Sequence, residues 1–440
     1  MPLNKNLGKA RIVSLGLQHV LAMYAGAILV PLIVGRALHL SSKELAYLVA
    51  IDLLTCGIAT LLQAWKNKFF GIGLPVVLGT SFVAVTPMIG IGTQYGMNAI
   101  YGSIITAGIF ILIFSPFFGK LAKLFPPVVT GSVVTIIGVS LVPAGIKNMA
   151  GGEGSPHFGD PENLLLSFGV FVFILLINRF FHGFIRAISV LLGIIAGTIV
   201  AAFMGKVDFT NVANASWFHV PQLFYFGTPS FEWGPMITMT LVGIVIIIES
   251  TGSFFALSKI CEQDINDQDL VRGYRAEGLS FILGGLFNAF PYSTFAQNVG
   301  LVQLTKIKTR SVVIAAGSIL VLLGLIPKIA AFTTIIPTPV LGGAMVVMFG
   351  MVVSSGIKML SSVDFQQQNN LLIVACSIAL GLGSTVVPNL FAQLPQIMRI
   401  LVGDGIVTGS LTAIILNLFF NLSLKEKPTV NNTLKTTIES

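Results

Sequence analysis

The sequence predicts an all-α polytopic membrane protein, and three observations lead to that prediction: the composition, the spacing of apolar segments and the placement of basic residues. Of the 440 residues, 54% are hydrophobic and only 10% are charged, and the mean hydropathy is +0.90. A soluble fold of this length could not bury so much apolar surface while keeping so few charges outside. Lipid is therefore the expected solvent around most of the chain.

Apolar segments near the ~20 residues that cross a bilayer as a helix recur along the whole chain. About fourteen spans are predicted, beginning near Ile12, Glu44, Gly71, Ala99, Pro127, Leu164, Ala187, Pro235, Gly273, Phe290, Ser311, Pro337, Asn370 and Gly405. The third and tenth spans are short and are interrupted by Gly or Pro. No small-residue cleavage site follows the first span, so we expect it to be retained rather than removed as a signal peptide.

Basic residues concentrate in alternate loops, as the positive-inside rule predicts. If the N-terminus is cytoplasmic, about 19 of the 25 basic residues lie inside, which leaves outside only Arg36, Lys43, Lys147, Lys206, Lys328 and Arg399. We therefore expect a multi-pass protein of the plasma membrane with both termini cytoplasmic and a polar cytoplasmic tail at residues 422–440. The net charge of +8 then requires no nucleic-acid partner.

An internal repeat indicates how the spans are organised. The segments PPVVTGSVVTIIGVSLVPAGIK, from Pro126, and PTPVLGGAMVVMFGMVVSSGIK, from Pro337, share the Pro entry, a pairing of Gly138 with Gly350 and a closing Gly-Ile-Lys after one slipped residue. They are the fifth and twelfth spans. Because they are seven spans apart, an odd number, they cross the bilayer in opposite directions. Two inverted repeats of seven spans, typical of secondary transporters, are therefore predicted. The alternative is a chance match of Pro and Gly in two membrane helices.

Spans three and ten are also mates in this arrangement, and they are the two interrupted spans. Irregular backbone at membrane depth is tolerated only where it lines a cavity enclosed by protein, so matched broken segments indicate a substrate site near the midplane. Helix breaks are expected at Pro75, Gly79 and Pro291. Hydroxyl groups follow that can satisfy the freed backbone groups, at Thr80, Ser81, Ser293 and Thr294.

Polar residues within the other spans are few. Each ionisable group at membrane depth costs at least ~2.5 kcal/mol, so it usually serves a pathway or a binding site. Glu249 and Ser253 are four residues apart and share one helix face. The alternative for Glu249 is a structural pair with His19. For Asp52, predicted near a helix end, it is structural pairing or snorkelling.

The chemistry of these groups suits a flat heterocycle. The amide of Gln297 offers a donor and an acceptor in one plane, which complements a lactam edge. Glu249 as a carboxylate accepts from N–H, and Phe82 offers a ring for stacking. A nucleobase fits this description, but the residues alone equally allow a small amide or an amino acid.

The stretch QNVGLVQLTK resembles the signature of the nucleobase–ascorbate transporter family. That signature is Gln, Glu or Pro, then Asn-x-Gly, four arbitrary residues, Thr, and a basic residue or Gly; the matching positions are Gln297, Asn298, Gly300, Thr305 and Lys306. The stretches LQHVLAMYAGAILVP, GTSF, ESTGSFFAL and RAEGLSFILGGLF are similar to other segments of the family, in the same order. The resemblance extends over nearly the whole chain.

The resemblance implies a proton-coupled nucleobase symporter with an elevator-type alternating-access mechanism, forming one transporter unit over residues 1–440. Its core domain, which carries the substrate, would comprise residues 12–125 and 234–327. Its gate domain, which also forms a homodimer in the lipid bilayer, would comprise residues 126–233 and 328–421.

The resemblance also implies site residues. Glu249 and Gln297 would hold the base, and Gln at this position accompanies purine diones, xanthine or urate. Ser253 and Glu277 depart from the Asp found at those positions in some xanthine carriers, which leaves xanthine versus urate open. The predicted substrate-binding residues are Glu249, Gln297, Phe82, Ser81, Ser253 and Asn298. Glu277 is the first candidate for proton coupling and His19 the second, because a carboxylate that leaves water as its helix moves changes its proton occupancy.

Other functions are weighed against this one. The alternatives within the fold are a uracil or other nucleobase permease and an anion transporter. An intramembrane enzyme would need paired acidic motifs for a metal-bound diphosphate, but the acidic segment Glu262–Asp269 is typical of a solvated loop. Cys56, Cys261 and Cys376 have no paired spacing, so neither a metal site nor a cofactor is expected.

Overall fold

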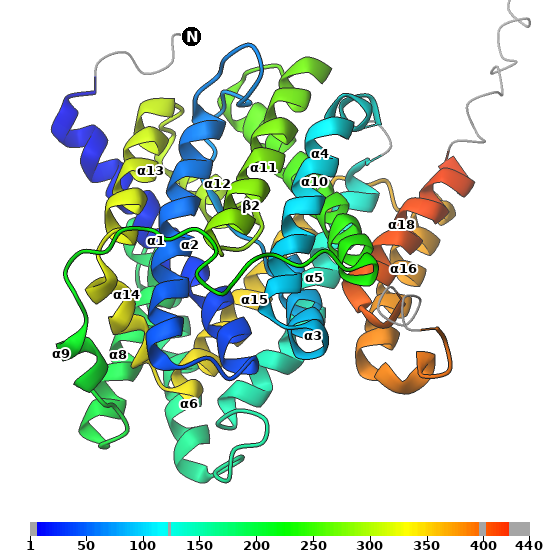
Figure 1. Cartoon of the computed structure of the whole chain (residues 1–440). Helices are drawn as coiled ribbons and strands as arrows, with labels where there is room; N and C mark the ends of the chain where they lie inside the picture. Colours follow the sequence, from blue (N-terminus) through cyan, green and yellow to red (C-terminus); the bar gives the residue numbers. More distant parts are fainter. Residues whose placement is uncertain (1–6, 122–124, 396–401, 422–440) are drawn as a thin grey trace, which may run out of the picture.

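The computed structural model describes residues 7–121, 125–395 and 402–421 (Figure 1). The predicted tail, together with Lys123 and Arg399, lies outside the described residues. The elements of the first half are α1 (Lys9–Ala37), α2 (Ser42–Ala64), β1 (Leu78–Thr80), η1 (Phe82–Ala84), α3 (Val85–Tyr95), α4 (Met97–Leu121), α5 (Pro127–Met149), α6 (Pro161–Phe180), α7 (Phe184–Ala187), α8 (Ser189–Phe203) and α9 (Thr210–Asn214).

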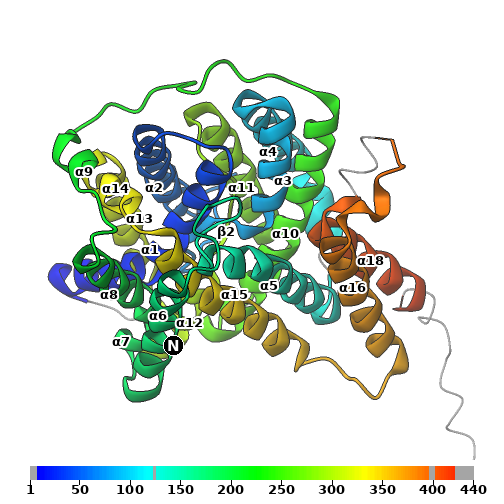
Figure 2. The same ribbon diagram turned by 90° about the horizontal axis from the view of Figure 1, so that it is seen from below.

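The second half begins with a helix as long as α1. Its elements are α10 (Trp233–Cys261), α11 (Asp267–Phe287), β2 (Tyr292–Thr294), α12 (Ala296–Thr305), α13 (Arg310–Gly324), α14 (Pro327–Thr334), α15 (Thr338–Leu360), α16 (Gln368–Val386), η3 (Pro388–Phe391) and α18 (Gly405–Asn421). Figure 2 shows β2 at the centre of the molecule among α1, α2, α10 and α11, with α16 and α18 at one edge.

The helices confirm a multi-pass membrane protein. Among the described residues, eight helices are long and apolar enough to cross a bilayer. The count rises to nine if α13 and α14, which meet at a bend of 79°, form one span. The helices α8 and α18 are apolar but shorter. The count of fourteen spans stays a prediction.

The two copies of the predicted repeat are α5 and α15, and they pack against one another. Gly131 of α5 lies against Leu360 of α15, and Gly138 lies against Val353. Residue numbers thus rise along α5 while those of its partners fall along α15, so the helices run antiparallel. This confirms for this pair the opposite directions that an inverted repeat requires. Glycine permits the close approach because a β-carbon would occupy the space of the facing backbone.

The interruption of spans three and ten is confirmed, and its form is a pair of β-strands. β1 and β2 are antiparallel, with Gly79 opposite Ser293 in the register. The pairing continues beyond the strands, since the N–H of Ser81 donates to the carbonyl of Pro291 at 2.9 Å and that of Phe295 donates to Val77 at 3.0 Å. Backbone groups that lack a helical partner are therefore satisfied by the other broken span.

The acidic segment between α10 and α11 pairs with basic loops at one end of the molecule. Glu262 contacts Lys308 at 2.8 Å, and Asp269 contacts Lys66 at 2.7 Å. The Lys308 side chain donates a hydrogen bond to Glu262 and holds the pKa of that exposed carboxyl below its usual value. The segment thus joins the loops that follow α2 and α12. Glu262 is exposed, as expected of a solvated loop, but the expectation is wrong for Asp267 and Asp269, because both belong to the first turn of α11 and Asp269 is buried.

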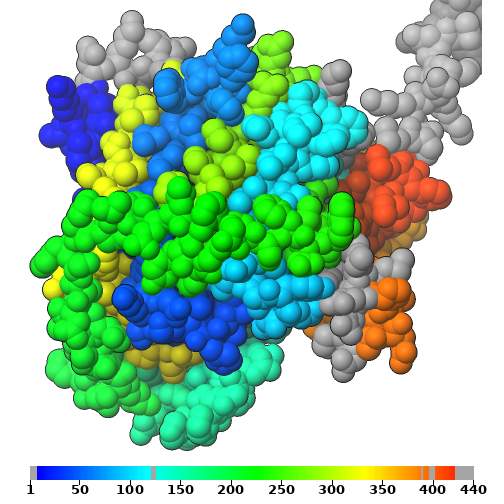
Figure 3. All heavy atoms as spheres, in the orientation of Figure 1, coloured from blue at the N-terminus to red at the C-terminus, as the bar shows by residue number. Residues whose placement is uncertain are grey.

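A long connection crosses the opposite end of the same bundle. Figure 3 shows the segment of residues 205–232, in green, lying over one face of the molecule. It is fixed there by hydrogen bonds, since the N–H of Ser230 donates to Asn98 at 3.1 Å and that of Phe224 donates to Leu286 at 3.1 Å. Tyr225 also stacks on Tyr47, with ring centroids 3.7 Å apart. The segment ties the start of α10 to α2, α4 and α11.

We predict that Gly138→Ala destabilises the protein through the α5–α15 contact. A β-carbon at Gly138 would lie 2.7 Å from the backbone nitrogen of Val353 and 2.9 Å from the carbonyl oxygen of Phe349. Overpacking of this kind costs about 1–3 kcal/mol, more than the ~0.5–1 kcal/mol that alanine gains over glycine in a helix. The midpoint of thermal denaturation in detergent should therefore fall.

Gly350→Ala is the matched control. A β-carbon there meets no described atom within 4 Å, so its thermal midpoint should stay the same or rise. Equal loss of stability in both variants would contradict the assigned contact.

Candidate functional site

We call the paired strands β1 and β2, residues 78–80 and 292–294, the crossing of the two broken spans. This crossing places the ends of two short helices in the protein interior. Ser81 follows β1 and accepts a hydrogen bond from the Val83 N–H at 3.3 Å, which opens η1. Gln297 is the second residue of α12, directly after β2. The positive N-terminal end of α12 thus lies at the crossing, where it favours polar or negative groups. Phe295 packs across Gly79, a position where a side chain would collide with that ring.

Glu249 lies in the middle of α10, against β2. Its carboxylate lies beside the Ser293 side chain of β2. Its Oε2 oxygen is buried and has no hydrogen-bond partner among the described residues. Glu249 and Gln297 are both only half-buried. A carboxylate oxygen that the protein leaves unpaired beside a half-buried amide is suited to accept a hydrogen bond from a ligand.

Phe82 and Ser253, two further predicted site residues, are both buried. The Phe82 ring is buried and meets the ring of Phe349 edge-on, with centroids 5.6 Å apart. Phe349 belongs to α15, so this contact joins the GTSF segment to a helix of the predicted gate. Ser253 is buried one turn after Glu249 on α10.

Glu277 of α11 is fully buried near Glu249. The two carboxyl groups interact electrostatically, and Ser250 lies beside Glu277. Neither carboxylate oxygen of Glu277 is in hydrogen-bonding geometry with any residue that the structure describes. The hydroxyl of Ser250 accepts from the N–H of Thr294 at 3.2 Å. Ser250 therefore holds β2 next to Glu249, its neighbour in the chain, and next to Glu277.

Asn298 and His19 are joined by hydrogen bonds. The side-chain amide of Asn298 donates to Nδ1 of His19 at 3.0 Å and to its carbonyl oxygen at 3.1 Å. Both residues are buried. The amide nitrogen of Asn298 is thus used to join α12 to α1, and the structure pairs His19 with Asn298 rather than with Glu249.

The remaining signature residues end α12. The Thr305 hydroxyl donates to the Leu301 carbonyl at 2.8 Å. Lys306 follows with φ of +57°, in the left-handed region. Glycine adopts this conformation freely, which explains why the family pattern admits Gly there. Gly300 is exposed. The first residue of the signature, Gln297, therefore lies at the candidate site, and its last residues, Thr305 and Lys306, terminate α12.

The β pairing and the structural contacts of Asp52 were not predicted from the sequence. The expectation that Asp52 lies near a helix end is wrong, because it lies in the middle of α2 and is completely buried. Its carboxylate accepts hydrogen bonds from the Thr80 hydroxyl, from the N–H of Phe290 at 3.3 Å and from the hydroxyl of Tyr292 at 3.2 Å. Asp52 therefore forms structural contacts and does not snorkel.

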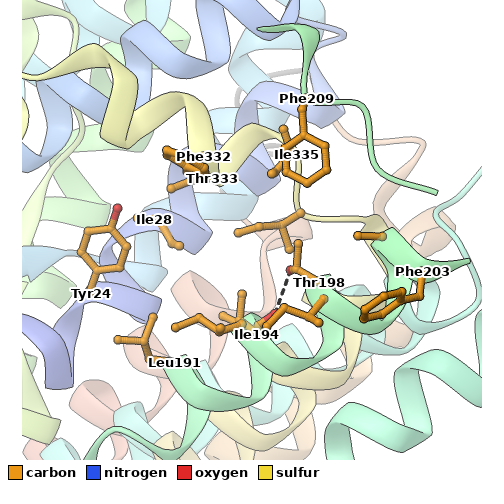
Figure 4. A pocket seen from close by; sticks show the side chains of 14 residues that line it. Tyr24, Ile28, Leu191, Ile194, Thr198, Phe203, Phe209, Phe332, Thr333 and Ile335 are labelled. Carbon is orange, nitrogen blue, oxygen red and sulfur yellow. Dashed lines mark hydrogen bonds between the residues drawn. The ribbon is translucent and has the colours of Figure 1, made fainter. Parts of the chain in front are cut away.

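An apolar pocket of about 530 Å³ lies elsewhere, between α1, α8 and α14 (Figure 4). The Thr198 hydroxyl donates to the Ile194 carbonyl at 2.7 Å, and that of Thr333 donates to Ala330 at 2.6 Å. These lining hydroxyls are thus engaged with their own helices. Apart from the Tyr24 hydroxyl, the lining offers little polar surface, so the pocket suits hydrocarbon better than a polar heterocycle.

Comparisons with known proteins show the family of this chain. A family model described as "Permease family" matches residues 10–390. The chain belongs to the nucleobase–ascorbate transporter family, in its xanthine and urate permease branch. It is therefore a multi-pass membrane transporter rather than an enzyme. Among the residues that the structure covers, no group of three or more His, Cys, Asp or Glu could hold a metal ion.

Curated relatives match over nearly their full length. The uric acid permease PucJ of Bacillus subtilis is 63% identical over 428 residues, covering 96% of this chain and 95% of the relative. The xanthine permease of the same organism is 60% identical over 420 residues, covering 96% of both. The transmembrane domain of the cyanobacterial bicarbonate transporter BicA is 14% identical with a TM-score of 0.59, covering 94% of this chain and 99% of that domain. This last likeness concerns the fold alone.

We predict that Ser250→Ala destabilises the site because the N–H of Thr294 loses its acceptor. An unsatisfied buried donor costs about 1–3 kcal/mol. Ser280→Ala is the control: Ser280 is also buried, but its hydroxyl donates to Ala276 in its own helix at 2.7 Å. Thermal denaturation in detergent should show a larger loss for Ser250→Ala. Equal losses in the two variants would argue against the contact between α10 and β2.

Proposed function

We propose that this protein takes up a purine dione, xanthine or urate or both, across the cell membrane together with protons. The observation that carries the proposal is the unpaired, buried oxygen of Glu249. Glu249 lies against β2, and the chain continues from β2 into α12, where Gln297 is the second residue. The relatives named as uric acid and xanthine permeases support the substrate class. The proposed substrate-binding set is that of the sequence prediction, with Ser81, Ser253 and Asn298 in supporting positions.

Recognition follows from matching donors and acceptors. A purine dione carries N–H groups beside carbonyl groups. Glu249 accepts from one N–H, the Gln297 amide pairs with an adjacent N–H and carbonyl, and Phe82 covers a face of the ring. The polar groups converge on one planar ligand, which favours a heterocycle over a small ion.

An anion substrate is the rival within the same fold, because the structural neighbour BicA is a bicarbonate transporter. A carboxylate with a buried, unpaired oxygen would repel a small anion and leave its own charge uncompensated. The position of Glu249 therefore favours a ligand with N–H donors.

Proton coupling is assigned to Glu277, with His19 as the second candidate. A proton can drive transport only if one conformation binds it more tightly than the other. Glu277 has free oxygens and a charged neighbour in Glu249, so its proton occupancy changes with the charge and hydration of the site. His19, in contrast, is held by Asn298.

Transport is proposed to proceed by elevator-type movement of the core domain (12–125 and 234–327) against the gate domain (126–233 and 328–421), as a homodimer in lipid. Arg36 of α1 donates to the carbonyl of Ile336 at 2.6 Å and to the hydroxyl of Thr338 at 3.0 Å. These contacts and the contact of Phe82 with Phe349 cross the proposed boundary. Movement would exchange such contacts for others while the crossing of β1 and β2 stays intact.

Uptake competition tests the function. Cells that lack their own permeases would express this protein, and uptake of radiolabelled xanthine would be challenged with urate, guanine, hypoxanthine and uracil. Inhibition by urate and not by uracil is expected. Inhibition by uracil alone would favour a uracil permease. Counterflow of labelled base in proteoliposomes without added anion separates the proposal from anion exchange.

We predict that Glu249→Gln weakens binding of the base about tenfold. The substitution keeps the shape but removes a charge-assisted hydrogen bond worth at least ~1.5 kcal/mol. Binding of labelled base to purified protein is the measurement. Glu262→Gln is the control, because Glu262 is exposed and pairs with Lys308 away from the crossing. Unchanged affinity in folded Glu249→Gln would remove Glu249 from the site.

We predict that Glu277→Gln binds the base but does not accumulate it against a gradient. Glutamine imitates the permanently protonated acid, so exchange of labelled for unlabelled base should persist while net proton flux is lost. Base-driven alkalinisation in proteoliposomes measures that flux. Normal proton movement with the base in this variant would place the coupling site elsewhere.

A further inference from the structure

Asp52 lies where the two broken spans meet, yet the proposed function gives it no role. Its buried carboxylate accepts from the hydroxyl of Thr80, the last residue of β1, from the N–H of Phe290 just before β2, and from the hydroxyl of Tyr292, the first residue of β2. One side chain therefore holds both strands. A carboxylate at membrane depth is expensive unless it is well hydrogen-bonded, and this one has three donors from two separate segments.

Other side chains of α2 continue the same contact. The Thr55 hydroxyl hydrogen-bonds with the Tyr292 hydroxyl. The Cys56 thiol donates to the carbonyl of Leu78 at 2.6 Å, and the N–H of Leu78 donates to the Thr60 hydroxyl at 3.1 Å. One face of α2 thus satisfies backbone and side-chain groups of both strands. The position of the crossing relative to α2 depends on this face.

The inverted repeat provides an internal comparison for Asp52. The helices α2 and α11 occupy equivalent places in the two repeats, and each begins with a capping box, on Ser41 in α2 and on Asn266 in α11. Asp52 lies eleven residues after Ser41, and Glu277 lies eleven residues after Asn266. The two acids are therefore counterparts.

The counterparts differ in their hydrogen bonds. Thr80 is the last residue of β1, and Thr294 is the last residue of β2. Asp52 accepts from Thr80, but the Glu277 oxygens and the Thr294 hydroxyl are without a partner in the described part of the chain. One acid is fully engaged with backbone and hydroxyl donors, and the other keeps its oxygens free. This difference indicates separate tasks.

We propose that Asp52 is a positioning residue of the substrate site, which fixes the crossing of β1 and β2 and thereby sets where Gln297 lies relative to Glu249. Side chains alternate along a strand, so Tyr292 faces Asp52 while Ser293 meets Glu249. Movement of β2 on the Asp52 side shifts Ser293 and Gln297 together. The inference rests on the proposed function because it concerns recognition of the base.

The test measures affinity and base preference in purified protein. Asp52→Asn keeps the size but replaces an acceptor oxygen with a donor, which opposes the donors that face it. We expect the Kd for radiolabelled xanthine or urate, whichever the wild type prefers, to rise at least tenfold, with weaker preference over hypoxanthine. Thr80→Val should act in the same direction. The double variant should be no worse than the more severe single one, because the contact that Thr80→Val removes is among those that Asp52→Asn already disrupts.

Asp404→Asn is the matched control. Asp404 is also a buried carboxyl, but it accepts from the Val407 N–H at 2.9 Å at the start of α18, away from the crossing. It should leave affinity and preference unchanged. If it reduced affinity as much as Asp52→Asn does, the effect would be general destabilisation and the proposal would be overturned.

The outcomes separate this proposal from the proposed function. Wild-type protein that binds neither xanthine nor urate overturns the function itself. Wild-type binding with unchanged affinity and preference in folded Asp52→Asn and Thr80→Val overturns the role of Asp52 alone. If Asp52→Asn does not fold, Thr80→Val and Tyr292→Phe, which retain the carboxylate, decide the question by the same criterion.

Discussion

Backbone that leaves helical geometry at membrane depth cannot turn to water for its hydrogen bonds, and the core of this protein is built around two such stretches. Each unsatisfied N–H or carbonyl there costs several kcal/mol. The backbone groups of the broken spans hydrogen-bond with one another as β1 and β2. Side chains of α2 and α10 accept from strand N–H groups that this pairing leaves without a partner. This requirement explains hydroxyl and amide side chains in helices that are otherwise apolar.

The same arrangement creates the site. Because strand residues alternate, β2 turns Tyr292 to Asp52 and Ser293 to Glu249. The chain then enters α12, which brings Gln297 to the crossing with a positive helix end behind it. The hydrogen bonds that satisfy the broken spans and the proposed recognition of the ligand thus depend on the same strand. Inverted repetition gives each repeat a carboxylate near the crossing, and their unequal hydrogen bonding distinguishes a structural acid from one with free oxygens.

Much of this was predictable from sequence because Pro and Gly break helices locally. While the roles of Glu249 and Gln297 remain proposals, the broken spans and the antiparallel repeat pair followed from local patterns. The strand pairing did not, because its register depends on contacts between residues more than 200 positions apart. The turn of Asn298 toward His19 was missed for the same reason, because these residues are 279 positions apart. The central position of Asp52 was missed for another reason. A membrane helix that is apolar on all sides has no polar face to show which way a side chain points.

The most direct test is a structure of the protein determined with xanthine or urate bound. The account predicts density for a planar base between Glu249 and Gln297, with one ring face against Phe82 and the strands β1 and β2 still paired. A base bound in the apolar pocket between α1, α8 and α14, or at any position out of hydrogen-bonding reach of Glu249, would contradict it.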